Sequence, residues 1–221
     1  MNSEIISAIG FVFAFLILLI ITHILLYKVC KVSPDNSRKF LHVSGGLLSL
    51  LLPSFISSHW LVLILCAAAF LILLVTFLTK TLSSVHEVKR QSFGSIIFPI
   101  PVYLCFYAAK MYNNDLLFYL PLSLLTLSDP VAEWAGKKWG HLSASFFKKQ
   151  KTIIGSLAFA LTSFAISTLW LRLMFHFSLA NTLKTAMIAT TITTIAELIS
   201  LKGIDNLTIP VSALIILILT G

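Results

Sequence analysis

Apolar residues dominate the chain in long, nearly continuous stretches that short polar segments separate. A run of about 20 apolar residues is long enough to cross the hydrocarbon core of a bilayer as an α-helix. The pattern predicts an all-α, polytopic transmembrane helical bundle of about seven to eight spans. The candidate spans, of which the second, fifth and last are short or interrupted, are 4–27, 43–58, 59–78, 95–112, 116–135, 153–175, 182–200 and 207–220.

Composition supports a membrane protein rather than a soluble one. Of the 221 residues, 58% are hydrophobic, and the mean hydropathy is +0.98, as is typical of integral membrane proteins. The connecting segments are short, so we expect a single integral membrane domain over 1–221. The first span is long and lacks a small-residue cleavage site, which predicts a retained anchor rather than a signal peptide.

The sixteen Lys and Arg residues are distributed unevenly. With the N-terminus outside, only Lys110, Arg172 and Lys184 fall on the outer face. An excess of Lys and Arg marks the cytoplasmic face, so the net charge of +8 reports topology and no nucleic-acid partner is expected. The cations on the other face are Lys28, Lys31, Arg38, Lys39, Lys80, Lys89, Arg90, Lys137, Lys138, Lys148, Lys149, Lys151 and Lys202.

Polar clusters concentrate on the same predicted cytoplasmic face, in the loops 28–42, 79–94, 128–156 and 197–206. We therefore expect these four segments to form one site. The three cysteines, Cys30, Cys66 and Cys105, have no paired spacing, which indicates neither a zinc site nor a disulfide framework.

Asp129 and Glu133 lie at the edge of an apolar span, in the segment LSDPVAEWAGKKWG. Carboxylates at membrane depth are costly, so they read as functional. Ser128-Asp129-Pro130 predicts a break in the fifth span, with Asp129 as a helix cap in the simplest structural interpretation. One helical turn brings Asp129 and Glu133 to one face, which suits a hard cation such as Mg²⁺.

Three further polar residues follow the seventh span. Glu197 stands alone in an apolar context near the inner end of that span, and Asp205-Asn206 opens the eighth. The Asp-Asn pair is equally well explained as a turn and cap. A lone carboxylate in Glu197's position has no such structural explanation.

Arg38, Lys39 and His42 form a basic start to the second span. Attraction to lipid headgroups would explain two cations at this place. It would not explain His42, which shares a helix face with Arg38 and is able to donate to a phosphate.

Two segments share one spacing: a cation, three residues, and then Gly-Ser at the start of an apolar helix. Such a helix start offers backbone amides, a positive dipole end and a hydroxyl cap, which suit a phosphate. Helix capping and topology explain each copy equally well on its own. The residues are Arg90, Gly94 and Ser95 in the first copy, and Lys151, Gly155 and Ser156 in the second.

Taken in order, the motifs RKFLH, RQSFGSIIFP, SDPVAEWAGKKWG, KTIIGS and E-x₇-DNLTIP resemble the polyprenol kinase family of integral membrane enzymes. That family includes phytol kinase, dolichol kinase and CTP-dependent diacylglycerol kinase, with phytol kinase the nearest likeness. The motifs span residues 38 to 210, almost the whole chain. One departure is Ser128-Asp129-Pro130, where many members have Gly-Asp and a small residue.

The resemblance implies transfer of the γ-phosphoryl group of CTP, or another nucleotide, to the hydroxyl of an isoprenoid alcohol such as phytol, farnesol or a polyprenol. It implies Mg²⁺ as cofactor and membrane lipids as surroundings, and it says nothing of the oligomeric state. Arg38, Lys39, Asp129 and Gly136 match the family's motif residues, and Glu133, Lys151, Gly155, Ser156, Glu197, Asp205 and Asn206 occupy further matched positions. Together with the patterns above, this predicts the catalytic residues Arg38, Lys39, Asp129, Glu133 and Glu197 and the metal ligands Asp129, Glu133, Asp205 and Asn206. The predicted nucleotide- or phosphate-binding residues are His42, Arg90, Gly94, Ser95, Gly136, Lys137, Lys151, Gly155 and Ser156.

Three alternatives remain open: a phosphatidate cytidylyltransferase-like enzyme, a diacylglycerol kinase, and an ion- or proton-coupled transporter. A transporter is expected to place its acids near the bilayer midplane. Here they lie towards one face beside many cations, which favours catalysis on a cytosolic phosphate donor. The expected location is a bacterial or archaeal cytoplasmic membrane, with the site facing the cytoplasm.

Overall fold

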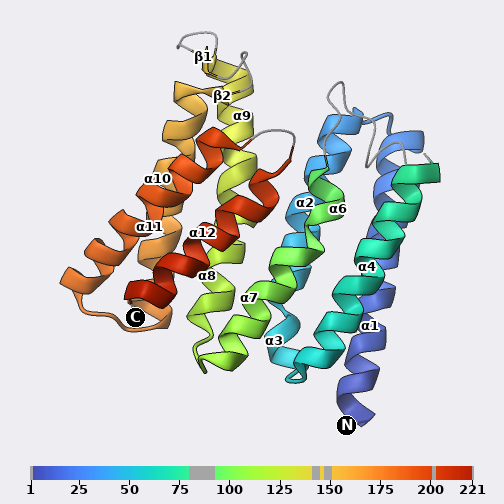
Figure 1. Ribbon diagram of the computed structural model, residues 1–221. Coiled ribbons are helices and arrows are strands. Elements are labelled where there is room, and N and C mark those ends of the chain that lie inside the picture. Colours follow the sequence, from blue (N-terminus) through green and yellow to red (C-terminus); the bar gives the residue numbers. More distant parts are fainter. Residues whose placement is uncertain (1, 80–92, 141–144, 147–150, 201–202, 221) are drawn as a thin grey trace.

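The computed structural model is helical almost throughout (Figure 1). It describes residues 2–79, 93–140, 145–146, 151–200 and 203–220. The predicted fold class, an all-α membrane helical protein, is confirmed. Within the described ranges, five helical segments are long and apolar enough to cross a membrane: Ser3–Val29, His59–Thr79, Gly94–Met111, Leu116–Trp139 and Ile153–Met174.

The elements fall into three successive groups along the chain. The first comprises α1 (Asn2–Ile20), its π-helical continuation η1 (Ile21–Val29), α2 (Pro34–Leu50), α3 (Leu52–Phe55) and α4 (His59–Thr79). The second comprises α6 (Gly94–Ile97), α7 (Pro99–Met111), α8 (Leu116–Ser123), the π-helical turn η2 (Leu124–Ser128) and α9 (Asp129–Trp139). The third comprises β1 (Ser145–Phe146), β2 (Lys151–Thr152), α10 (Ile153–Leu169), η4 (Trp170–Met174), α11 (Leu179–Ile199) and α12 (Asp205–Thr220).

Helix α2 begins earlier than the predicted second span. The hydroxyl of Ser33 accepts a hydrogen bond from the Asn36 N–H at 3.3 Å, and Pro34 occupies the first turn, a favoured helix start. Arg38, Lys39 and His42, which the sequence predicted at the start of this span, therefore lie inside α2, one to two turns after its first residue. Their spacing is fixed by the helical repeat.

The predicted break at Ser128-Asp129-Pro130 was wrong. Helices α8 and α9 are joined through η2 without a non-helical residue, and Asp129 has helical backbone angles of φ −63° and ψ −47°. A π-turn is wider than an α-turn and leaves room for a proline ring inside the continuous helix. Asp129 consequently does not cap a new helix; it projects from a continuous one.

The backbones of helices α9 and α10 approach each other closely at two glycines. A Cβ added at Gly155 would lie 3.1 Å from the Ala132 carbonyl oxygen and 3.5 Å from the Cα of Gly136. Two glycines facing each other allow this approach, as small residues do in membrane helix pairs. The contact fixes the start of α10 against the first two turns of α9.

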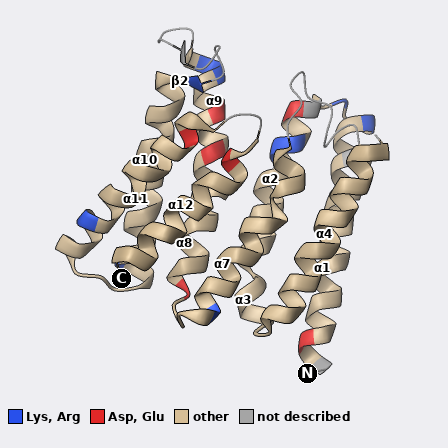
Figure 2. Cartoon of the chain, viewed as in Figure 1, with Lys and Arg blue, Asp and Glu red and all other residues tan. Residues whose placement is uncertain are grey.

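Most of the charged residues gather at one end of the bundle, and a few lie at the opposite end and on α11 (Figure 2). At this end α2, α6, α10 and α12 begin, and α9 and α11 end (Figure 1). The pair β1–β2, antiparallel with Phe146 opposite Lys151, brings Lys151 to the same place. Both termini lie towards the opposite end (Figure 1).

Candidate functional site

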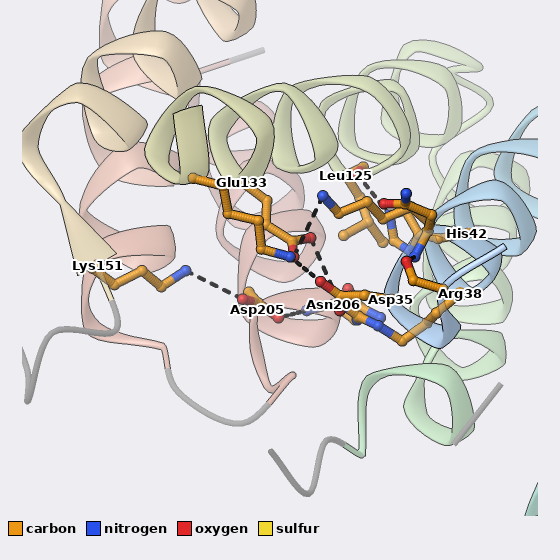
Figure 3. A network of polar contacts seen from close by, with 12 residues as sticks. Asp35, Arg38, His42, Leu125, Glu133, Lys151, Asp205 and Asn206 are labelled. Atoms are coloured by element: carbon orange, nitrogen blue, oxygen red, sulfur yellow. Dashed lines mark hydrogen bonds and ion pairs between the residues drawn. The ribbon is translucent and has the colours of Figure 1, made fainter. Parts of the chain in front are cut away.

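A cluster of five charged residues joins α2 to α9. Glu133 lies 3.5 Å from Arg38, 3.6 Å from Lys39 and 2.6 Å from Lys137. Asp35 accepts a hydrogen bond from Lys137 and lies 3.7 Å from Arg38. We call Asp35, Arg38, Lys39, Glu133 and Lys137 the Glu133 cluster; Figure 3 shows it between the two helices.

Helix geometry assembles each half of this cluster locally. Glu133 and Lys137 are one turn apart on α9, and Asp35 and Arg38 are one turn apart on α2, which are spacings that form ion pairs on a helix face. Three cations against two carboxylates leave one positive charge in excess. An arrangement of this kind is suited to an additional anion.

Burial and charge change the protonation equilibria in the Glu133 cluster. Burial alone would raise the pKa of Asp35, but the hydrogen bond and charge of Lys137 outweigh it and hold that pKa below its ordinary value. Burial lowers the pKa of Lys39, and the charge of Glu133 offsets this only in part. Lys39 is thus partly desolvated, so water screens its charge less than that of a fully exposed lysine when an anion approaches.

A second cluster lies where β2, α10, α11 and α12 meet. The ammonium of Lys151 lies 2.5 Å from Glu197 Oε1 and 3.3 Å from Asp205 Oδ2. The Ser156 hydroxyl donates to the other oxygen of Glu197 at 3.3 Å. We call Lys151, Ser156, Glu197 and Asp205 the Lys151 cluster; part of it is drawn in Figure 3.

The Lys151 cluster satisfies the buried Glu197. Only 3% of Glu197 is exposed, and a buried carboxylate needs a partner. Burial works against the charge of Lys151, but Asp205 and Glu197 outweigh it and raise the pKa of Lys151 above its ordinary value. Lys151 is therefore a stable cation whose charge is already matched by two acids.

Asp129 lies between the Glu133 cluster and the Lys151 cluster, and its carboxylate is bonded to no described residue of either. The charges of Asp205, Lys151, Glu133 and Glu197 all act on it. Within the described part of the chain, its carboxylate makes no hydrogen bond or ion pair. Glu133, Glu197 and Asp205 nearby are each paired with a cation, whereas Asp129 is not. Asp129 is therefore the acid of the site that is best placed to bind a ligand.

A hydrogen-bonded junction closes the site on the side of α6. The Asn206 side-chain amide donates to the Gly94 carbonyl at 2.8 Å, and a Cβ at Gly94 would lie 2.8 Å from that amide nitrogen. Nε2 of His42 donates to the Leu125 carbonyl at 3.1 Å. These bonds tie α12 to α6 and α2 to η2, so Asn206, Gly94 and His42 have structural partners.

The sequence predicted that the serine of each Gly-Ser pair caps its helix, and the structure shows this at neither copy. At the second copy the capping hydroxyl belongs to Thr152, which accepts from the Gly155 N–H at 3.1 Å. Ser156 bonds Glu197 instead, as described above. At the first copy α6 begins at Gly94 without a side-chain cap. Arg90 lies outside the described residues. Phosphate binding at Gly136, Lys137, Gly155 and both serines stays a prediction.

Of the four predicted metal ligands, Asp129, Glu133, Asp205 and Asn206, only Asp129 is free of other partners among the described residues. Among the described residues, no group of three or more His, Cys, Asp and Glu side chains is arranged to hold a metal. Glu133 and Asp205 are paired with cations, and the Asn206 amide is bonded to Gly94. Mg²⁺ is often held by one or two carboxylates together with substrate phosphates. Asp129 fits that kind of site, with the nucleotide supplying the remaining oxygens.

Asp35 and Thr152 were missed by the sequence interpretation. Asp35 stands three residues before Arg38 and just after Ser33-Pro34, so a helix start at Pro34 would have placed it on the face of Arg38. Thr152 stands three residues before Gly155, which is the spacing of a capping hydroxyl.

The chain matches no protein-family model and no solved structure. It is 24% identical over 211 residues to a phytol kinase from Synechocystis sp.. The match covers 95% of this chain and 89% of that protein. The likeness to a phytol kinase therefore extends through every segment of the candidate site.

Proposed function

We propose that this protein is a membrane-embedded kinase that transfers the γ-phosphoryl group of CTP to the hydroxyl of an isoprenoid alcohol. The observation that carries the proposal is Asp129, an acid with no partner among the described residues, which lies between the Glu133 cluster and the Lys151 cluster at one end of the helices. The near-full-length similarity to a phytol kinase supports the isoprenoid alcohol as acceptor. The resemblance of the motifs supports CTP as donor.

Phosphoryl transfer needs alignment and neutralisation of charge more than covalent chemistry. In the proposed reaction the alcohol oxygen attacks the γ-phosphorus, the bond from that phosphorus to the β–γ bridging oxygen breaks, and CDP leaves. The hydroxyl proton passes to a carboxylate of the site, Asp129 or Glu197. Arg38, Lys39 and Lys137 stabilise the negative charge that spreads over the phosphates.

Mg²⁺, when bound with the nucleotide, would supply further neutralisation of phosphate charge. Asp129 would hold it from the protein side. Glu133 has a different role in this proposal: it keeps Arg38, Lys39 and Lys137 together until the phosphates arrive. The excess of Lys and Arg at the charged end indicates that this end faces the cytoplasm, where nucleotides are available. The membrane in this proposal is bacterial or archaeal.

The test is an assay of purified protein in detergent with γ-labelled CTP or ATP. The acceptors are phytol, farnesol, dolichol and diacylglycerol, and Asp129→Asn is the control for contaminating kinases. We expect a labelled isoprenoid phosphate, formed faster with CTP than with ATP. Labelled pyrophosphate released in the presence of phosphatidate would favour the cytidylyltransferase alternative instead. Absence of lipid phosphate with every acceptor and both nucleotides would refute the kinase.

A further inference from the structure

An apolar groove runs between α1, α2, α4 and α7 and ends beside the candidate site. The groove is partly open, and the space between its walls together with the open space at its mouth amounts to about 1020 Å³. Its walls are hydrocarbon side chains such as Phe15, Leu48, Leu73 and Val102. Ser49, which also lines it, donates its hydroxyl to the Gly45 carbonyl at 2.8 Å and so adds little polarity.

The remaining polar residues of the groove lie together at one end. They are Arg38, His42, Ser95 and Asn206. Arg38 belongs both to this end and to the Glu133 cluster, so the groove opens onto the cations of the proposed phosphate site. The Nε atom of Arg38 is buried and has no hydrogen-bond partner among the described residues. Because buried donors are normally satisfied, this one points to an oxygen supplied by a ligand.

We propose that the groove holds the hydrocarbon chain of the acceptor alcohol, with the hydroxyl at the Arg38 end, and that its length selects the acceptor. This proposal rests on the kinase function above and adds to it where the lipid lies. A single chain with one polar head matches a groove with hydrocarbon walls and one polar end.

The dimensions of the groove indicate the length of the chain. It follows α2 and α3 from Arg38 to Leu52, a distance of about 21 Å at the helical rise of 1.5 Å per residue. An extended chain advances about 1.2 Å per bond, so the groove matches roughly 17 bonds. The main chain of phytol or geranylgeraniol has about this length.

The two ends and the width of the groove agree with a branched chain of this size. At the far end Leu52 is buried, and the rings of Phe11 and Phe55 pack edge to face at 5.9 Å. Along the groove, small side chains leave room for methyl branches. They are Gly45, Cys66, Ala68 and Ala69.

Gly45 offers a direct test because it lies about 10 Å along α2 from Arg38, half-way down the groove. A Cβ added there would meet only Leu18 Cδ2, at 3.9 Å, so a larger side chain enters the groove rather than a packed interface. Gly45→Leu should therefore block the deeper half and leave the shallow half open.

The experiment compares phytol with geraniol, whose main chain is half as long, in the wild type, Gly45→Leu and Gly10→Leu. Gly10 is the matched control: it lies on α1, an added Cβ meets nothing within 4 Å, and it does not line the groove. We expect Gly45→Leu to lower kcat/KM for phytol by at least about tenfold, the discrimination that several methylenes supply. The kcat/KM of Gly45→Leu for geraniol and for CTP should stay within about threefold of the wild type. Gly10→Leu should leave kcat/KM for both alcohols unchanged.

Two results would overturn the groove assignment while leaving the kinase intact. One is an equal loss for phytol and geraniol in Gly45→Leu. The other is unchanged chain-length preference accompanied by loss of co-purifying phospholipid, which would mean that the groove holds a structural lipid. If the wild type phosphorylates neither alcohol with any nucleotide, the proposed function itself fails.

Discussion

The ammonium of Lys151 lies 2.5 Å from the carboxylate of Glu197, 46 residues further along the chain. This pair joins the strand β2 to the C-terminal end of α11 and leaves Lys151 with less freedom than a lysine in an open loop would have. Lys151 is therefore expected to support the fold as well as any nucleotide, and its substitution should report both effects.

Lys151→Gln is expected to lower the free energy of unfolding by on the order of 3 kcal/mol, because it leaves the buried carboxylate of Glu197 without its cation. The double variant Lys151→Gln/Glu197→Gln should recover part of the loss, since no uncompensated charge remains. Thermal unfolding in detergent measures both. The control is Lys138→Gln, whose ammonium lies outside the cluster over the rings of Trp134 and Trp139. Equal melting temperatures for all variants would show that the pair is not formed in solution.

Asp129→Asn is expected to reduce turnover at least ~100-fold, the scale of losing one electrostatic contact in a transition state. The substitution keeps the size of the side chain, and Asp129 has no partner among the described residues to lose, so the melting temperature should hardly change. Asp115→Asn, the same substitution at the opposite end of the bundle, is the control. Near-normal activity in the Asp129 variant would place the site elsewhere.

Gly155→Ala is expected to destabilise the protein by about 1–3 kcal/mol, as overpacking does. The added methyl would lie 3.0 Å from the Thr152 hydroxyl and 3.1 Å from the Ala132 carbonyl, so α10 must shift from α9. Gly45→Ala is the matched control, because its methyl has room and alanine favours a helix by roughly 0.5–1 kcal/mol. A higher KM for CTP in Gly155→Ala at unchanged stability would instead support direct approach of phosphate to this glycine.

Asp35 should make stability depend on pH in the acid range. Its folded-state pKa is lowered, because the hydrogen bond and charge of Lys137 outweigh burial. A lowered pKa contributes stability above the unfolded value of about 3.9 and loses it as the pH falls through the folded value. Asp35→Asn should therefore unfold at a lower temperature than the wild type at pH 7. The difference should shrink towards pH 3. A difference that does not vary between pH 7 and pH 3 would mean that the ion pair is absent.

Much of the architecture follows from hydrophobic runs and helix spacing. The apolar stretches predicted the helical membrane fold, and the i,i+4 spacing of Asp129 and Glu133 placed both acids on α9. The turn preference of Ser-Asp-Pro misled the prediction at 128–130, because the widened π-turn that accommodates Pro130 depends on packing around η2 and not on local composition.

The partners of the site residues required three-dimensional information. Asp35 and Lys137 are 102 residues apart, and Lys151 and Asp205 are 54 apart. No spacing rule links such positions. The sequence placed Lys151 and Gly155 together as a phosphate site, whereas the fold gives Lys151 two carboxylate partners and places Gly155 against α9. Both are consequences of how α10 packs between its neighbours.

The continuous helix from Leu116 to Trp139 also determines how deep the chemistry lies. Asp129 is ten residues from Trp139, about 15 Å along the helix axis, so it lies further into the apolar span than the exposed Trp134, Lys138 and Trp139 side chains. For the proposed reaction, an alcohol reaches that depth by giving up the hydration of one hydroxyl, whereas a phosphate monoester is charged and is driven back towards water. Depth in the bilayer would then give the reaction a direction, admitting the lipid from the hydrocarbon side and expelling the product towards the headgroups.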